Sequence, residues 1–476
     1  MRFLGLLLVA LSLSAQTLGT RIDTILRRSP AAQQSLWGIR IVNLQTGTVV
    51  FSKNQSQFFV PASNAKLFST ALALTRLGPN HRFRTFITAP APPDDAGHVA
   101  SLRFVGGGDP NLSGRAIPYQ PDPPDDGNPL HNNPLQHVEQ FARQLHSSGL
   151  RHVDGDIIGD DSAYAFEPFP EGWALDDPVY GYGAPVSALL LNDGMFTVRV
   201  TPTSDGQPPR IEAVPLIRDL TIHNRAVTGP INKLKFQRLP GAHEIALTGT
   251  VSTPQKQTLA MEHPSLFAAE ALRDALLRQG IRVSGEARVE HFPSPGVTLL
   301  THESPPLIEH LRIINKESVN LHAEMVLLEV ARVRRGTGSR EAALAELKAF
   351  LGELGITSNQ YFFTDGSGLS RHTLVTPLTI TTLLEYMYKS PHRDAWIGTL
   401  PVGGADGTLR KRFRGGGNAR KIAAAKVHAK TGSITHANAL SGYAGRYAFS
   451  ILVNNSNHPA AQVRRVIDQI VLTLVP

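Results

Sequence analysis

Residues 61–78 have the sequence PASNAKLFSTALALTRLG. Between Ser63 and Leu77 there is neither glycine nor proline, and apolar side chains fall on most faces of the helix that this segment predicts. Pro61 precedes the helix and Gly78-Pro79 ends it, in keeping with the backbone preferences of these residues. A helix that is apolar nearly all round packs inside a core, so the segment predicts a buried helix.

Ser63 and Lys66 lie at the start of this helix. Residues three apart on a helix lie one turn apart on the same face, so the two side chains can meet. A serine hydroxyl needs a base to become a good nucleophile, and a lysine in a dry site can lose enough pKa to serve as that base. Of the 12 lysines, only Lys66 has a serine three positions before it. The alternative, a capping serine followed by a surface lysine, is disfavoured by the apolar surroundings.

Two further motifs follow along the chain. Ser318-Val319-Asn320 lies between two predicted helices, but the same S-x-N pattern occurs at Ser52-Lys53-Asn54, and helix capping is an alternative. Lys430-Thr431-Gly432-Ser433 contains the only K-T-G and ends a predicted strand. A lysine and hydroxyls there can hold a carboxylate, and glycine lets a ligand backbone approach; the alternative is an ordinary turn. S-x-x-K, S-x-N and K-T-G in this order are typical of penicillin-binding proteins and class A β-lactamases.

The two ends of the chain share a mixture of helices and alternating strands, whereas the middle is rich in loops and short strands. We therefore expect an α/β (α+β) fold in which one domain, residues 20–80 and 300–476, is split by a large insertion. The insertion comprises a first part, 81–195 with 255–299, and a mainly β second part, 196–254. The predicted helices cover 22–28, 63–77, 137–148, 264–278, 305–314, 321–334, 340–352 and 460–474, and the predicted strands cover 37–44, 48–53, 102–105, 426–429, 439–444 and 447–454.

Composition excludes several classes of protein. The 476 residues are 41% hydrophobic and 18% charged, enough apolar surface for packed cores. The net charge is +8, yet the densest basic run is only Arg410-Lys411-Arg412, so nucleic-acid binding is disfavoured. The chain has no cysteine, which excludes disulfides and thiol catalysis. Neither H-E-x-x-H nor G-x-S-x-G occurs, so we expect no catalytic metal, no cofactor and no α/β-hydrolase site.

The N-terminus has the features of a signal peptide over residues 1–15. A positive start at Arg2 is followed by an apolar run, Phe3 to Leu13, and by the small residues Ser14 and Ala15. A buried N-terminal helix is the alternative. We expect an exported protein in the periplasm or on the outer face of the cytoplasmic membrane, with loose membrane association left open. No oligomeric state is predicted.

The chain resembles the class C low-molecular-mass penicillin-binding proteins, the D-alanyl-D-alanine carboxypeptidase/endopeptidases. The resemblance covers nearly the whole mature chain and includes the long gap between Lys66 and Ser318. It rests further on residues 106–110 (GGGDP), 155–162 (GDIIGDDS), 182–189 (YGAPVSAL), 315–318 (NKES), 365–371 (DGSGLSR), 406–409 (DGTL) and 439–443 (ALSGY).

The resemblance implies an antiparallel sheet flanked by helices, with two inserted domains of largely β character. It implies cleavage of the terminal D-Ala-D-Ala bond, and often of cross-links, in peptidoglycan stem peptides, and acylation by β-lactam antibiotics. Two positions depart from the usual pattern: Val319 stands where aspartate is frequent, and Ser433 where threonine is common. The rival hypotheses are a β-lactamase or esterase of the same fold and a non-catalytic cell-wall-binding scaffold.

The resemblance also implies a role for each motif residue. Ser63 is the nucleophile, Lys66 its base, Ser318 a proton relay and Asn320 an orienting amide. Lys430 is a catalytic residue that also helps to hold the terminal carboxylate of the substrate. The three residues after it on the strand, Thr431, Gly432 and Ser433, bind the same carboxylate end. Backbone N–H groups of Ser63 and Ser433 form the oxyanion hole.

Overall fold

The computed structural model describes residues 17–475, apart from 122–132, 219, 240 and 414–416. The predicted signal peptide, residues 1–15, lies outside the described residues. No helix in the described part of the chain is both long and apolar enough to cross a membrane.

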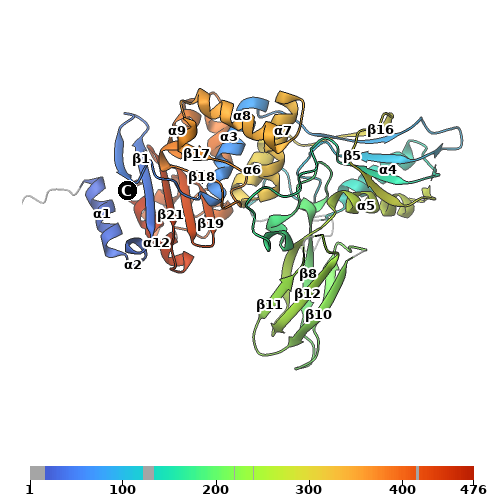
Figure 1. The fold of residues 1–476 in the computed structure, drawn as a ribbon, viewed down its shortest axis with the longest axis horizontal. Helices are drawn as coiled ribbons and strands as arrows, with labels where there is room; N and C mark the ends of the chain where they lie inside the picture. Colours follow the sequence, from blue (N-terminus) through green and yellow to red (C-terminus); the bar gives the residue numbers. More distant parts are fainter. Residues whose placement is uncertain (1–16, 122–132, 219, 240, 414–416, 476) are drawn as a thin grey trace, which may run out of the picture.

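A five-stranded antiparallel sheet joins the two ends of the chain (Figure 1). Its order is β19-β20-β21-β1-β2, so C-terminal strands pair directly with N-terminal ones. Trp37 lies opposite Val453, and Ile41 lies opposite Phe449. The strands are β1 (Leu36–Asn43), β2 (Val49–Lys53), β19 (Val427–Ile434), β20 (Ala437–Ala444) and β21 (Tyr447–Asn454). The predicted fold class, an antiparallel sheet flanked by helices, is confirmed.

Helices cover both faces of this sheet. Alternate residues of a strand point to opposite faces, so Phe449 and Ile451 of β21 join one core while Leu452 joins the other. The first core receives α1 (Leu18–Arg28), α2 (Pro30–Gln33), α11 (Gly417–Ala425) and α12 (Ala460–Leu472). The second receives α3 (Lys66–Leu77), α6 (Leu307–Glu317), α7 (Asn320–Arg335), α8 (Arg340–Glu353), α9 (Pro377–Lys389) and α10 (Arg393–Thr399).

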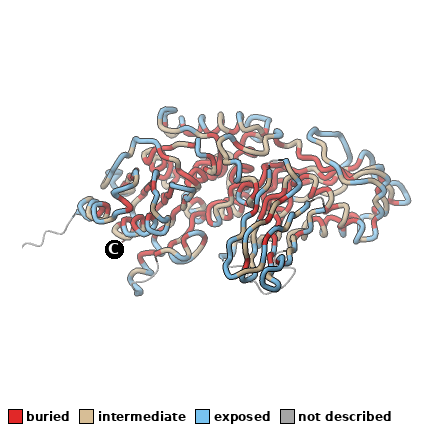
Figure 2. Tube along the Cα trace, turned by 60° about the horizontal axis from the view of Figure 1, so that its bottom comes forward, coloured by how far each residue is buried: buried red, intermediate tan, exposed pale blue. Residues whose placement is uncertain are grey.

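The segment 61–78 forms the central helix of the second core. Its first turn is a 3-10 turn, η1 (Ala62–Ala65), which continues directly into α3. Every residue from Lys66 to Leu74 is buried. Figure 2 shows that buried segments run through the middle of the molecule, with exposed ones around them. Gly78, at a φ of +77°, ends the helix with its N–H bonded to the Leu74 carbonyl.

The first part of the insertion is built on a second five-stranded sheet, of order β15-β7-β5-β3-β16. Two helices, α4 (Gln136–Ser147) and α5 (Pro264–Arg278), share its hydrophobic core. The strands are β3 (Arg84–Ala89), β5 (Leu102–Val105), β7 (Ile157–Asp160), β15 (Ala287–Glu290) and β16 (Val297–Glu303). A small parallel sheet beside it consists of β4 (His98–Val99), β6 (His152–Val153) and β14 (Arg282–Val283).

The second part of the insertion consists of two three-stranded sheets that project from the rest of the molecule (Figure 1). One sheet contains β8 (Met195–Thr201), β9 (Arg210–Val214) and β13 (Gln255–Ala260), and the other β10 (Thr221–Thr228), β11 (Lys233–Gln237) and β12 (Glu244–Val251). The sequence placed residues 255–299 with the first part. Because β13 pairs with β8 along its whole length, residues 255–260 belong with the second part instead.

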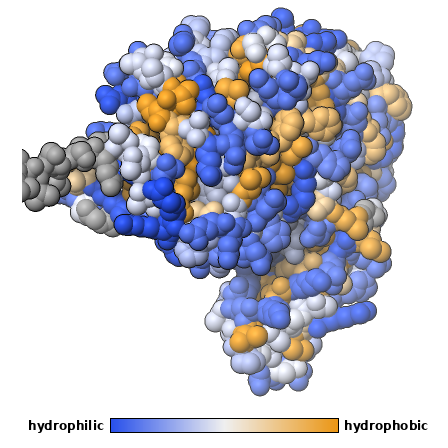
Figure 3. Space-filling model, turned by 60° about the vertical axis from the view of Figure 1, so that its left-hand side comes forward, coloured by the Kyte–Doolittle hydropathy of each residue, from blue (hydrophilic) through white to orange (hydrophobic). Residues whose placement is uncertain are grey.

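The remaining elements are short. They are the 3-10 turns η2 (Asp177–Val179), η3 (Gly181–Gly183), η4 (Asn192–Gly194), η5 (Ser358–Gln360) and η6 (Gly407–Leu409), and the strands β17 (Tyr361–Phe362) and β18 (Leu374–Val375). The face shown in Figure 3 is largely hydrophilic, with hydrophobic residues gathered in separate patches.

Candidate active site

Ser63 lies in η1, at the buried N-terminal end of α3. The residue before it, Ala62, has a φ of +47°, an unusual conformation for a residue with a side chain. Ala62, Asn64 and Ala65 are all buried, whereas Ser63 is partly exposed. The turn therefore presents the Ser63 hydroxyl to solvent from an otherwise buried segment.

Lys66 is fully buried and contacts Ser63 directly. Its Nζ donates hydrogen bonds to Ser63 Oγ at 2.9 Å, Asn320 Oδ1 at 2.6 Å and the Ser367 carbonyl at 2.7 Å. Burial lowers the pKa of Lys66 to about 7, against the opposing effect of the Asp365 and Glu324 carboxylates. A substantial neutral fraction near neutral pH allows this lysine to accept the serine proton.

Ser318 and Asn320 come from the junction between α6 and α7. Ser318 ends α6 in the left-handed conformation, with a φ of +62°, and Asn320 is the first residue of α7. Besides accepting from Lys66, Asn320 donates through Nδ2 to the Tyr182 carbonyl at 2.8 Å. Ser318-Val319-Asn320 is therefore the S-x-N motif that lies at the site. The other S-x-N motif, Ser52-Lys53-Asn54, lies on β2 and in the turn after it.

Lys430 on β19 is the second buried lysine of the site. Its Nζ donates to Ser318 Oγ at 2.8 Å and to the Thr431 carbonyl at 2.9 Å. Burial and the neighbouring Lys66 hold the pKa of Lys430 well below its usual value, against the effect of Glu317. Asn64 Nδ2 donates to the Lys430 carbonyl at 2.9 Å and so ties β19 to the serine turn. The three sequence motifs therefore meet in one place.

Thr431, Gly432 and Ser433 continue along β19, which is the edge strand of the sheet. Thr431 is half-buried and donates to Thr408 Oγ1 at 2.8 Å, and Ser433 is exposed. From the sequence, Gly432 is expected to let the backbone of a ligand come close. A Cβ on Gly432 would lie 2.7 Å from the Pro61 carbonyl oxygen, so glycine is required for β19 to pass the serine turn.

Sequence reasoning missed the carboxylates that surround Lys66. Glu324 of α7 is fully buried and accepts the backbone N–H groups of Gly366 at 3.0 Å and Ser367 at 2.8 Å. Asp365 accepts from the Ser370 N–H at 2.8 Å. These bonds hold the loop whose Ser367 carbonyl contacts Lys66. A glutamate inside the apolar run of α7 was the available signal, because buried carboxylates occur where they have partners.

The insertion also contributes to the site. Tyr182, whose carbonyl accepts from Asn320, has a half-exposed side chain stacked on Tyr180 with ring centroids 5.6 Å apart. The stretch 182–189 carries part of the family resemblance, but no sequence motif assigned Tyr182 a role at the site. Among the residues that the structure describes, no group of metal-ligating side chains lies at this site.

Known proteins resemble this chain over nearly its whole length. The sequence profile of the D-Ala-D-Ala carboxypeptidase 3 (S13) family matches residues 18–474. A D-alanyl-D-alanine carboxypeptidase from an Actinomadura species is 32% identical over 463 residues, which cover 92% of this chain and 81% of the relative.

Solved structures have the same fold. Penicillin-binding protein 4 of Haemophilus influenzae superposes with a TM-score of 0.81 at 23% identity, covering 95% of this chain and 98% of that one. The same protein in complex with a β-lactam superposes with a TM-score of 0.75 at 20% identity, over the same shares of both chains. The likeness extends over the inserted parts as well as the sheet that carries Lys430.

Proposed function

Because the chain belongs to the D-Ala-D-Ala carboxypeptidase 3 (S13) family, we propose that Ser63 is the nucleophile with which it cleaves the terminal D-Ala-D-Ala bond of peptidoglycan peptides. The observation that carries this proposal is the contact between Ser63 Oγ and the buried Lys66, whose pKa lies at about 7. Cross-linked peptides are the second substrate class, and β-lactams are expected to acylate the same serine.

In the acylation step, neutral Lys66 takes the Ser63 proton as Oγ attacks the carbonyl carbon of the penultimate D-Ala. The C–N bond then breaks, and the proton that Lys66 accepted passes to the leaving D-Ala nitrogen through Ser318, which is hydrogen-bonded to Lys430. Lys66 is thereby neutral again. In deacylation, neutral Lys66 takes a proton from a water molecule as that water attacks the ester carbonyl. The ester C–O bond then breaks, Ser63 Oγ receives this proton, and the shortened peptide is released.

Charge on the substrate is stabilised by two groups of donors. Backbone N–H groups of Ser63 and Ser433 bind the developing oxyanion, and each such donor stabilises a transition state by about 3–4 kcal/mol. The terminal carboxylate lies against Lys430, Thr431 and Ser433 on the edge strand β19. An edge strand suits this role because its backbone can pair with an extended peptide.

The same proposal places the mature protein outside the cytoplasm, in the periplasm or on the outer face of the cytoplasmic membrane. A signal-peptide-like N-terminus and a cell-wall substrate support this location. Loose attachment to the membrane stays an open alternative.

The decisive experiment is the intact mass of the mature protein after brief exposure to benzylpenicillin, together with D-Ala release from a peptide ending in D-Ala-D-Ala. Wild type should gain one persistent adduct and release D-Ala, whereas Ser63→Ala should do neither. Ser52→Ala is the matched control, because Ser52 belongs to the exposed second S-x-N motif and should behave as wild type.

The rival functions predict other outcomes. Rapid penicillin hydrolysis without a lasting adduct would indicate a β-lactamase. Binding to peptidoglycan that survives Ser63→Ala, with no adduct and no D-Ala release in wild type, would indicate a scaffold. A Ser63→Ala variant that still forms the adduct would show that another residue is the nucleophile.

A further inference from the structure

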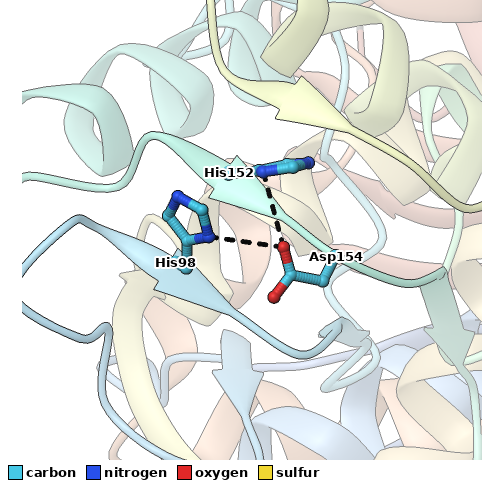
Figure 4. A group of neighbouring side chains, drawn as sticks. All are labelled: His98, His152 and Asp154. Carbon is cyan, nitrogen blue, oxygen red and sulfur yellow. Dashed lines mark ion pairs between the residues drawn. The ribbon is translucent and has the colours of Figure 1, made fainter.

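Two histidines and an aspartate converge on the first part of the insertion, in a small sheet separate from the one that carries Lys430. His98 of β4 lies opposite His152 of β6 in a parallel pairing, and Asp154 follows one residue after β6 ends. Figure 4 shows both imidazole rings turned toward the Asp154 carboxylate. None of these three side chains lies at the Ser63 site or takes part in the proposed peptidase reaction.

The separations between the three groups suit a shared ion better than direct hydrogen bonds. Asp154 Oδ1 lies 3.5 Å from His98 Nδ1 and 3.4 Å from His152 Nδ1. Nitrogen-to-oxygen hydrogen bonds are shorter, about 2.7–3.2 Å. Ligands about 2.0–2.1 Å from a tetrahedral Zn²⁺ are about 3.3 Å from one another. The two measured distances therefore fit two edges of such a tetrahedron, and ligand atoms of all three residues lie within 4.8 Å of one another.

Neighbouring contacts orient the donor atoms. His152 Nε2 lies 2.8 Å from Ser284 Oγ, and a hydrogen donated there leaves the Nδ1 lone pair free to face Asp154. The backbone N–H of His98 donates to Asp94 Oδ1 at 2.8 Å, which fixes the strand and adds a second negative charge nearby. Asp154 is about half exposed, with 54% of its side chain accessible, so water can complete the coordination shell.

We propose that His98 Nδ1, His152 Nδ1 and Asp154 Oδ1 bind a divalent transition-metal cation of the Zn²⁺ class, with water as the remaining ligand. Two imidazoles and one carboxylate favour Zn²⁺, Co²⁺ or Ni²⁺ over Mg²⁺ and Ca²⁺, which prefer oxygen ligands. The ion would link β4 to β6. Both strands are only two residues long, so a cross-link between them should stabilise this edge of the insertion.

The test is titration of the untagged, chelator-treated full chain with Zn²⁺ by calorimetry, and with Co²⁺ by visible absorption. We expect one strong Zn²⁺ site per chain, a Co²⁺ spectrum of low-symmetry coordination, and a higher melting temperature with Zn²⁺. His98→Ala and Asp154→Asn should each weaken Zn²⁺ binding by about 10-fold or more and remove the thermal shift. His223→Ala is the matched control, because His223 pairs with Glu244 at 3.0 Å, away from the three proposed ligands, and should leave the strong site unchanged.

The proposal is overturned if wild type has no strong Zn²⁺ site. It is also overturned if Asp154→Asn and His98→Ala both keep wild-type affinity, since the bound zinc would then lie elsewhere among the 18 histidines. Circular dichroism of the metal-free variants separates loss of the site from loss of the fold. Asp154→Asn keeps the side-chain shape, so its result stands even if His98→Ala fails to fold.

Discussion

Lys66 illustrates how the chemistry depends on single residues. Burial lowers its pKa to about 7, so the neutral form that can accept the Ser63 proton increases as pH rises through that value. We predict that the rate constant for acylation by benzylpenicillin rises through about pH 7 and levels off above it. Lys66→Arg should lower this rate constant by about 100-fold or more and abolish the rise, because a guanidinium stays protonated. Stopped-flow acylation across a pH series measures both effects.

Lys53→Arg is the control for this change, since Lys53 is exposed on β2 and lies outside the site. It should retain the wild-type rate and pH profile. A Lys66→Arg variant with the same rise through neutral pH would assign the titration to another group and contradict the role of Lys66 as the base.

At the scale of elements, the position of the serine turn depends on the loop between β17 and β18. Gly368 of this loop has a φ of +76°, and a Cβ there would overlap the Ala62 carbonyl oxygen. Gly336, after α7, has the same φ but open space around it. Gly336→Ala should therefore cost only the backbone strain, about 1–2 kcal/mol. Gly368→Ala should cost more and also displace Ser63, slowing acylation.

Urea denaturation and benzylpenicillin acylation of both variants test this prediction. Gly336→Ala should acylate at the wild-type rate, which separates strain from displacement of the turn. Equal stability losses and equal acylation rates in the two variants would mean that the loop does not position the serine.

At the scale of the whole molecule, the insertion is joined to the catalytic helices by buried charges. Asp193 in η4 pairs with Arg115 and, at 2.9 Å, with His322 of α7. Burial alone would raise the pKa of Asp193, but Arg115 and His322 outweigh it and hold that pKa below its usual value. The ionised carboxylate therefore stabilises the fold above about pH 4, and this contribution is lost as pH falls through the lowered pKa.

Asp193→Asn should lower the free energy of unfolding by about 2 kcal/mol at neutral pH, because it leaves the half-buried Arg115 and the buried His322 without the carboxylate they share. The difference from wild type should shrink below about pH 4. Urea denaturation at several pH values measures both. Asp274→Asn, which removes the partner of the exposed Arg218, should change the stability little. A loss independent of pH would show that the Asp193 charge is not the cause.

Local patterns were sufficient for much of the fold. The buried helix of 61–78, the helices beginning near 320 and 340, and the strand 447–454 follow from periodicity and breakers that act over a few residues. Local sequence patterns gave the wrong length for a strand where pairing with a neighbouring strand sets that length. The strand predicted over 426–429 extends to Ile434 as β19, because β20 pairs with its glycine and hydroxyl residues along the whole length. Strand pairing likewise joins β13 to β8, and so puts residues 255–260 in the second part of the insertion.

The amino-acid sequence by itself determined the family and the order of the three motifs, because each motif is contiguous and its chemistry is visible in neighbouring residues. Only the tertiary structure decided which S-x-N meets Lys66, that Glu324 and Asp365 surround that lysine, and that His98 and His152 lie side by side. These contacts join residues far apart in the chain. Strand register and helix packing bring them together, and neither is encoded in any short segment.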